Sequence, residues 1–210
     1  ANSGNVARRL LRFNDLESEP LYHPPKHDGA YRCEDFSDYL FAVGRLDPLK
    51  RFDLLLRAMA HTDSGCRCRI AGTGPKREEL EAMASDLGIG DRVEFVGWVS
   101  DEELLDLYAN AFAVFYAPYD EDYGYVTIEA FRSGKPVITA DDSGGVLEFV
   151  DDGVTGVVCA SGSPSRFGRR IDELFVDRER ARQLGAAGRE RVAFIGWNHV
   201  IEKLTGVKQP

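Results

Sequence analysis

Residues 39–60 read YLFAVGRLDPLKRFDLLLRAMA and contain an apolar run, a polar turn and an amphipathic segment. The apolar run at residues 39–44 is typical of a strand that is covered on both faces of a sheet. Phe52, Leu55, Leu56 and Met59 then recur at helical spacing, so we expect a helix over residues 49–60. A buried strand followed by a helix is the basic unit of a parallel α/β sheet.

The same alternation continues along the chain. We expect further strands at residues 69–72, 93–97, 113–117, 136–140 and 156–159. Helices are expected between them, opened by Pro75, by the capping box of Ser100 and Glu103, and by Tyr125. Six strands in this order predict an α/β fold: a doubly wound, Rossmann-like parallel six-stranded sheet with strand order 3-2-1-4-5-6 and helices on both faces.

Composition divides the chain into three parts. Residues 1–38 contain a short amphipathic stretch and a Pro-rich stretch without periodicity, which predict a leading helix and a connector. Residues 39–195 contain the predicted sheet and its helices, and residues 196–210 a last helix.

Charge and apolar content exclude several classes of protein. The 210 residues carry a formal net charge of −9, which argues against a broad nucleic-acid surface. The longest apolar run, AFAVFYA at residues 111–117, is far shorter than a membrane-spanning helix requires, and no secretion signal is recognisable at the start. Four cysteines include the pair Cys66 and Cys68, whose spacing favours packing over a zinc site. We therefore expect free thiols and a cytoplasmic protein.

The predicted strand order selects two loops as the ligand site, because ligands bind where the order of strands reverses. The loop after the first strand contains Gly44, Arg45 and Lys50, and the two cations suit a pyrophosphate. By spacing alone they are as consistent with solvated surface charges. The loop after the fourth strand contains Glu121 and ends at Gly124, where a helix N-terminus could approach an anion.

Three further patterns leave alternatives open. Glu121 and Glu129 could face one crevice and accept bonds from sugar and ribose hydroxyls, although many acids crowd that stretch. The turn at residues 72–75 follows a strand and could contact a ligand or simply connect two elements. Asp120 and Asp122 form a D-x-D pair that could hold a divalent ion, but Arg45 and Lys50 already supply positive charge, so we expect no metal.

Several stretches together resemble the donor-nucleotide half of a retaining GT-B glycosyltransferase of family 4. They are VGRLDPLKRFDLLLRAM, IAGTGPKREELE, VEFVGWVSDEELLDLYANA, EDYGYVTIEAFRSGKPVIT and DSGGVLEFVDDGVTG. ANSGNVARRLLRF and LYHPP are similar to the stretch where such chains enter this half, and residues 197–204 to the helix that returns to the other half.

The resemblance assigns roles to individual residues. It implies that Arg45 and Lys50 hold the donor diphosphate beside Gly44, and that Glu121 and Glu129 are the two acids of the family's E-x7-E motif. Glu121 would bind the donor sugar and Glu129 the ribose.

Other positions follow from the same resemblance. An aromatic-Gly-apolar segment whose backbone amides approach the sugar and phosphates corresponds to Tyr123, Gly124, Tyr125 and Val126. The base-binding region corresponds to Trp98 and Val99, with Gly72 nearby, and the GG-x-x-E element, expected to be structural, to Gly145 and Glu148.

The resemblance implies a hexosyltransferase that uses a UDP- or GDP-sugar as donor and no cofactor. The N-terminal acceptor-binding half of such enzymes is absent from these residues, so we expect a missing domain of the same enzyme as partner, which could hold the protein at a membrane surface. A non-catalytic sugar-nucleotide-binding module and a nucleotide-sugar epimerase of GT-B shape are the alternatives.

Overall fold

A parallel sheet of six strands forms the centre of the computed structural model, which describes residues 1–206. The strands are β1 (Tyr39–Val43), β2 (Arg67–Ala71), β3 (Val93–Gly97), β4 (Ala113–Phe115), β5 (Val137–Ala140) and β6 (Gly156–Cys159). Their order is β3-β2-β1-β4-β5-β6, with β1 paired to both β2 and β4. The predicted doubly wound fold and strand order are confirmed.

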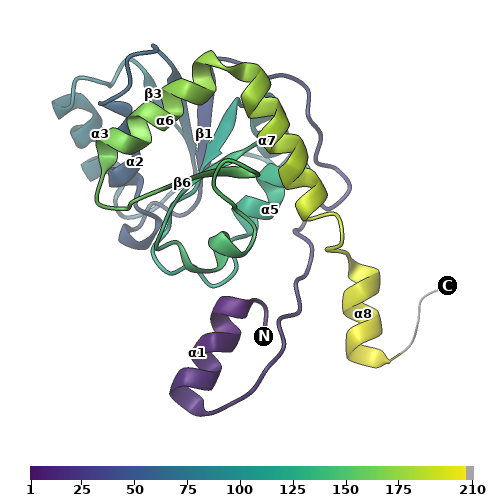
Figure 1. Cartoon of the computed structure of the whole chain (residues 1–210). Coiled ribbons are helices and arrows are strands. Elements are labelled where there is room, and N and C mark those ends of the chain that lie inside the picture. Colours follow the sequence, from purple (N-terminus) through teal and green to yellow (C-terminus); the bar gives the residue numbers. More distant parts are fainter. Residues whose placement is uncertain (207–210) are drawn as a thin grey trace.

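Alternate residues of each strand face two separate apolar layers. In β1, Leu40 packs into one layer and Phe41 into the other, and both are fully buried. The first layer includes apolar residues of α2 (Phe52–Met59), α3 (Arg77–Asp86) and α6 (Pro164–Val176). The second includes residues of α4 (Asp101–Asn110) and α5 (Tyr125–Arg132), while α7 (Arg178–Arg191) packs against α5 and α6. The sheet is thus covered on both faces, as Figure 1 shows.

Several predicted boundaries differ from the structure. The helix expected over residues 49–60 is a 3₁₀ turn, η1 (Pro48–Lys50), followed by α2, because Arg51 between them adopts a left-handed conformation with φ 50°. The helix expected to open at Pro75 begins at Arg77, after a turn. The strand expected over residues 113–117 ends at Phe115, where the chain leaves the sheet.

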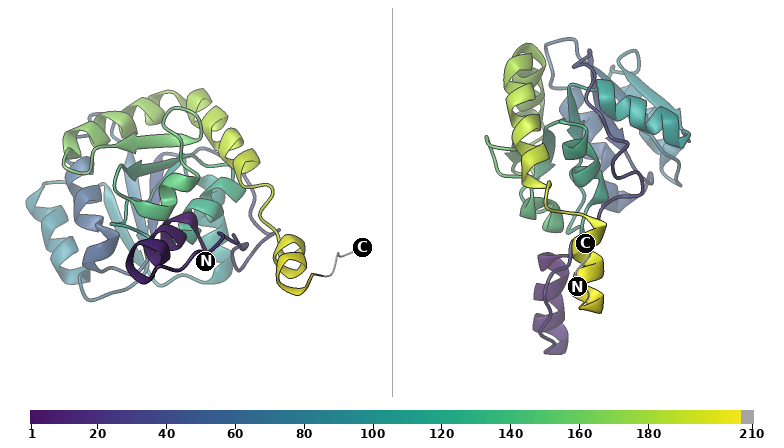
Figure 2. Two further views of the ribbon diagram at one scale, coloured as in Figure 1. Left: turned by 60° about the horizontal axis from the view of Figure 1, so that its bottom comes forward. Right: turned by 90° about the vertical axis from the view of Figure 1, so that its right-hand side faces the viewer.

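Two helices lie outside the layers, beyond one edge of the sheet domain. They are α1 (Gly4–Asn14), which Ser3 caps, and α8 (Trp197–Thr205). Both project from the same side of the sheet (Figures 1 and 2). The predicted division at residues 38 and 195 stays a prediction, and residues 207–210 of the last predicted segment lie outside the described residues. Among residues 1–206, the helices are all too short or too polar to cross a membrane.

Candidate functional site

The loops that follow β1 and β4 meet at the carboxyl edge of the sheet. The amide of Tyr119 donates a 2.9 Å hydrogen bond to the carbonyl of Leu49, which ties the two loops together. The two strands before them are neighbours, so their ends lie at the same edge. The structure therefore brings together the two loops that the strand order selects.

Lys50 and Glu121 form an ion pair between these loops. Lys50 Nζ lies 2.5 Å from Glu121 Oε2, and the two side chains are 24% and 20% exposed. The Tyr116 hydroxyl donates to the same carboxylate oxygen at 2.9 Å and accepts from Lys50 Nζ at 3.3 Å. Asp47 caps η1, the 3₁₀ turn that ends at Lys50. Its carboxylate accepts hydrogen bonds from the amides of Leu49 and Lys50 and so holds the backbone of this loop. A positive and a negative group thus point into one half-buried space.

Arg51 holds the loops on either side of this pair. Its guanidinium donates two bonds to the carboxylate of Asp142, at 3.0 and 2.6 Å, and further bonds to the carbonyls of Ala117 and Pro118. Although burial raises the pKa of Asp142, the bonds and charge of Arg51 hold that pKa below its ordinary value. Sequence reasoning missed Arg51, because an arginine beside a predicted phosphate-binding lysine looks like one more surface cation.

Gly124 directly precedes α5 and lies close to Tyr116, which contacts the ion pair. Its φ is 80°, and a Cβ there would lie 2.9 Å from Val146 Cγ2 and 3.2 Å from Tyr116 Cε1. No side chain of residues 1–206 caps this helix start. A helix start with uncapped N–H groups and no room for a side chain is suited to an anion.

The tyrosines on either side of Gly124 are anchored to the connector. The Tyr123 hydroxyl donates to the carbonyl of His23 at 2.8 Å, and the Tyr125 hydroxyl lies 2.9 Å from Nδ1 of the same histidine. Tyr123 is buried, Tyr125 is exposed and Val126 is half-buried. The predicted aromatic-Gly-apolar segment is thus held rigidly against residues of the Pro-rich stretch.

Glu129 lies one turn further along α5, in a more buried place than Glu121. Its Oε2 accepts a 2.7 Å bond from the hydroxyl of Tyr108 on α4. Burial raises the pKa of Glu129, although the bond from Tyr108 opposes this shift. Burial raises the pKa of Tyr116, and the charges of Glu121 and Glu129 raise it further. No hydrogen bond or ion pair joins the two glutamates within the described residues.

The glycines after β1 and β2 allow the strand ends to approach each other closely. A Cβ on Gly72, whose φ is 121°, would lie 2.0 Å from the carbonyl oxygen of Gly44. The amide of Gly72 donates to the carbonyl of Gly97 at 2.7 Å, so the ends of β2 and β3 are joined as well. The glycines thus permit the close packing of the ends of β1, β2 and β3.

Arg45, Trp98 and Val99 stand apart from the ion pair. The side chain of Arg45 is 75% exposed, and its guanidinium lies 4.0 Å from the carboxylate of Asp47. Trp98 is 78% exposed, whereas Val99 is half-buried against the second apolar layer. Among the described residues, no hydrogen bond or ion pair joins Arg45 or Trp98 to Lys50 or Glu121. Their predicted roles stay predictions.

The D-x-D pair is bound by α1 rather than presented to the site. Asn5 Nδ2 donates to Asp120 Oδ1 at 2.8 Å, and Arg9 pairs with both Asp120 and Asp122. Within residues 1–206, no group of three or more His, Cys, Asp or Glu side chains is arranged to hold a metal ion.

Glu148 accepts bonds from the first turn of α1, namely from the amides of Gly4 and Asn5 at 2.9 and 2.6 Å. It also accepts from the hydroxyl of Tyr22 at 2.7 Å. Gly145 donates to the carbonyl of Glu121 at 2.7 Å. This element, between β5 and β6, therefore supports the loop that carries Glu121.

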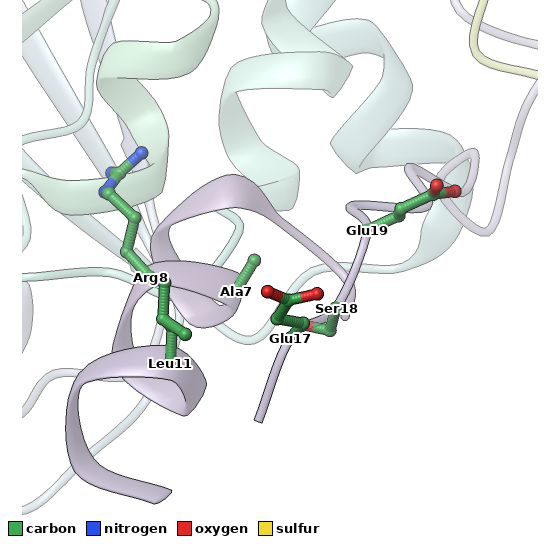
Figure 3. A pocket seen from close by; sticks show the side chains of 6 residues that line it. All are labelled: Ala7, Arg8, Leu11, Glu17, Ser18 and Glu19. Atoms are coloured by element: carbon green, nitrogen blue, oxygen red, sulfur yellow. The ribbon is translucent and has the colours of Figure 1, made fainter. Parts of the chain in front are cut away.

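A separate cavity of about 550 Å³ lies along α1, away from the ion pair. Figure 3 shows its lining, in which the side chain of Arg8 points away from Glu17 and Ser18. No residue that the sequence singled out for chemistry lines this cavity, so it adds nothing to the candidate site.

Comparison with known proteins identifies the family. The model of the family described as "Glycosyl transferases group 1" matches residues 31–191, most of the chain. The chain belongs to the glycosyl transferases group 1 family. The match includes every predicted site residue, from Gly44 to Glu129.

Relatives within the glycosyl transferases group 1 family are longer proteins. The chain is 36% identical over 172 residues to a D-inositol 3-phosphate glycosyltransferase of Nocardia farcinica, a match that covers 77% of this chain and 38% of the relative. It is 38% identical over 173 residues to a GDP-mannose-dependent alpha-(1-6)-phosphatidylinositol monomannoside mannosyltransferase of Mycobacterium tuberculosis, covering 77% of this chain and 45% of the relative. The chain therefore spans less than half the length of these relatives.

Solved structures share the fold of this group 1 chain. HepE of Anabaena, crystallised with UDP and glucose, aligns with a TM-score of 0.86 at 20% identity, over 99% of this chain and 62% of HepE. Sucrose-phosphate synthase from Thermosynechococcus elongatus aligns with a TM-score of 0.85 at 25% identity, over 97% of this chain and 55% of the synthase. At these identities the likeness supports the predicted Rossmann-like sheet.

Proposed function

We propose that the chain is the donor-binding half of a retaining glycosyltransferase that transfers a hexose from a UDP- or GDP-sugar. The observation that carries the proposal is the Lys50–Glu121 ion pair beside the uncapped start of α5. A cation and a helix N-terminus favour a diphosphate, and a carboxylate at the same place favours sugar hydroxyls. These are the two chemical parts of a nucleotide sugar that must lie next to each other.

The relatives support this class of donor. One relative is named for its dependence on GDP-mannose, and HepE was crystallised with UDP-glucose as well as with UDP. The choice between uridine and guanosine nucleotides depends on the base-binding region, for which Trp98 and Val99 after β3 are the proposed residues. Glu129, one turn into α5, is proposed to bind the ribose.

The chemistry that these residues supply is stabilisation of the leaving diphosphate. As the bond to the sugar breaks, negative charge grows on the diphosphate, and groups already aimed at it lower the barrier. We propose that Lys50 and the start of α5 act in this role, and that Arg45 joins them from its exposed position. The leaving diphosphate takes the acceptor proton in the proposed reaction, which requires no protein nucleophile and no metal.

The acceptor is proposed to bind to a further domain of the same enzyme. The chain spans less than half of its relatives, and the two helices outside the sheet layers expose large apolar side chains. These include Leu11, Phe13, Trp197 and Leu204, of which Phe13 and Leu204 are 70% and 73% exposed. Apolar side chains at such exposure on helices beyond the core are suited to packing against another domain.

Titration calorimetry of the chain with UDP-glucose, GDP-mannose, UDP, GDP and the free nucleosides tests the proposal. We expect one nucleotide series to bind, with the diphosphate far tighter than its nucleoside because the charged contacts dominate. Failure of both series to bind, or equal binding of nucleoside and diphosphate, would overturn the proposed function.

A further inference from the structure

Each acid of the Glu121–Glu129 pair accepts a hydrogen bond from a buried tyrosine. Tyr116 donates to Oε2 of Glu121 at 2.9 Å, and Tyr108 donates to Oε2 of Glu129 at 2.7 Å. Tyr116 is 6% exposed and Tyr108 is fully buried, so each hydroxyl reaches its carboxylate from the core side. The two contacts have the same chemistry but come from different elements, since Tyr116 follows β4 and Tyr108 lies on α4.

Tyr116 contacts both Lys50 and Glu121 and lies beside Gly124. Besides Glu121, its hydroxyl accepts from Lys50 Nζ at 3.3 Å, and the Lys50 ammonium lies 5.5 Å from the centre of its ring. A Cβ at Gly124 would lie 3.2 Å from Cε1, at the edge of the Tyr116 ring. Tyr116 therefore contacts the cation and the carboxylate and packs next to the start of α5.

The Tyr108 ring, whose hydroxyl bonds to Glu129, is packed among other aromatic rings. It packs edge-on against Phe41 and Tyr31, with distances between ring centres of 5.0 and 6.0 Å. Both neighbours are buried, so the Tyr108 hydroxyl cannot turn away from Glu129 without disturbing the core. Tyr108 makes no hydrogen bond to Lys50 or Glu121 within the described residues.

Tyr116 and Lys50 both hold Oε2 of Glu121, whose Oε1 accepts no hydrogen bond from the described residues. At Glu129, Tyr108 holds Oε2, and the Tyr31 hydroxyl also lies close enough to help lower the pKa of this acid. The terminal torsion of a glutamate is broad and turns easily unless something fixes it. A hydrogen bond to one oxygen fixes the plane of the carboxylate and with it the direction of the other oxygen. A ligand hydroxyl needs that direction to be defined in advance, because ordering the carboxylate on binding would weaken the contact.

We propose that Tyr116 and Tyr108 are positioning residues that orient Glu121 toward the sugar and Glu129 toward the nucleoside of the donor. The inference rests on the proposed function and adds to it two residues that act through the acids. In the competing interpretation, both tyrosines are ordinary core residues whose hydroxyls happen to meet a carboxylate.

The variants Tyr116→Phe and Tyr108→Phe test the proposal, because each keeps the ring and removes only the hydroxyl. Tyr39→Phe is the matched control: Tyr39 is also buried, but its hydroxyl donates to the carbonyl of Leu107 and meets no carboxylate. Each variant is titrated with the nucleotide sugar that the unaltered chain binds, UDP-glucose or GDP-mannose, and with the corresponding free diphosphate. Thermal unfolding of all three gives the cost of losing a buried hydroxyl.

The two variants are expected to fail differently. Tyr116→Phe should lower the affinity for the nucleotide sugar roughly tenfold and the affinity for the free diphosphate clearly less. The preference for the sugar-bearing ligand should therefore fall. Tyr108→Phe should lower the affinity for both ligands by roughly the same factor, since both carry the ribose. Tyr39→Phe should change neither affinity.

A second experiment separates positioning from general destabilisation. If Tyr116 acts through Glu121, then Tyr116→Phe added to Glu121→Gln should weaken the nucleotide sugar no further than Glu121→Gln alone. Additive losses, or equal losses for both ligands in both single variants, would overturn the inference while the proposed function stands. Absence of nucleotide binding by the unaltered chain would instead overturn the proposed function, and this inference with it.

Discussion

Lys50 and Glu121, 71 residues apart in the sequence, form an ion pair of 2.5 Å across the ends of two neighbouring strands. Each charge compensates the other while no ligand is present. In the proposed function, a nucleotide sugar gives each of them a new partner, a diphosphate for Lys50 and hydroxyl groups for Glu121. Donor binding would then exchange the partners of Lys50 and Glu121.

Removing the cation tests the phosphate side of this exchange. Lys50→Ala should weaken UDP or GDP binding by roughly ten- to a hundredfold, because charge-assisted hydrogen bonds contribute about 1.5–3 kcal/mol each. Nucleoside binding should hardly change. Arg57→Ala, which removes an exposed positive charge from α2, is the control for net charge and should bind like the unaltered chain. Equal losses for nucleoside and diphosphate in Lys50→Ala would contradict the assignment.

Chelation tests whether a metal takes part. Arg9 and Asn5 bind the carboxylates of Asp120 and Asp122, which leaves the D-x-D pair poorly placed to hold an ion. We expect diphosphate affinity, measured by calorimetry, to be the same with and without EDTA. A large loss on chelation that manganese or magnesium restores, and that Asp120→Asn abolishes, would show that a metal bridges the donor.

The buried acid should reduce stability as the pH rises. Because burial raises the pKa of Glu129 in the folded state, the folded chain binds the proton more tightly than the unfolded chain does. The contribution of Glu129 to stability is therefore greatest below the ordinary value of 4.5 and is lost as the pH rises through the raised pKa. Glu129→Gln should remove this loss, so its melting temperature relative to the unaltered chain should be higher at pH 7 than at pH 4. A difference that does not change with pH would contradict the prediction.

The close approach of the strand ends can be tested at Gly72. A Cβ there would lie 2.0 Å from the carbonyl oxygen of Gly44, in a backbone conformation with φ 121°. Gly72→Ala should cost roughly 3 kcal/mol or more of unfolding free energy, through strain and overpacking together. Gly90→Ala is the control, because nothing lies within 4 Å of a Cβ at Gly90, and it should change stability by less than about 1 kcal/mol. Similar losses for the two variants in denaturant unfolding would be inconsistent with this geometry.

The strand order could be predicted from the sequence because it depends on local patterns. Apolar runs such as residues 39–44, capping residues such as Ser100 and the alternation of elements are each readable within a short window. The strand order then placed Lys50 and Glu121 in adjacent loops, and the structure brings their side chains into contact.

Other features depend on partners that are distant in sequence. Arg51 interrupts the predicted helix in a left-handed conformation that its bonds to Asp142, 91 residues later, support. Asn5 binds the loop of Glu121 across 116 residues. Tyr108 and Tyr116 look like ordinary core aromatics in the sequence, and only the fold shows that their hydroxyls meet the two acids.

The most direct test of the donor site is calorimetry of Glu121→Gln and Glu129→Gln against a nucleotide sugar and its free diphosphate. Both substitutions keep the shape of the side chain and remove its charge. The account predicts that Glu121→Gln weakens the nucleotide sugar but leaves the diphosphate nearly unchanged, whereas Glu129→Gln weakens both because both carry the ribose. Matching losses for the two variants, or no loss for either, would contradict the proposed division between sugar and ribose.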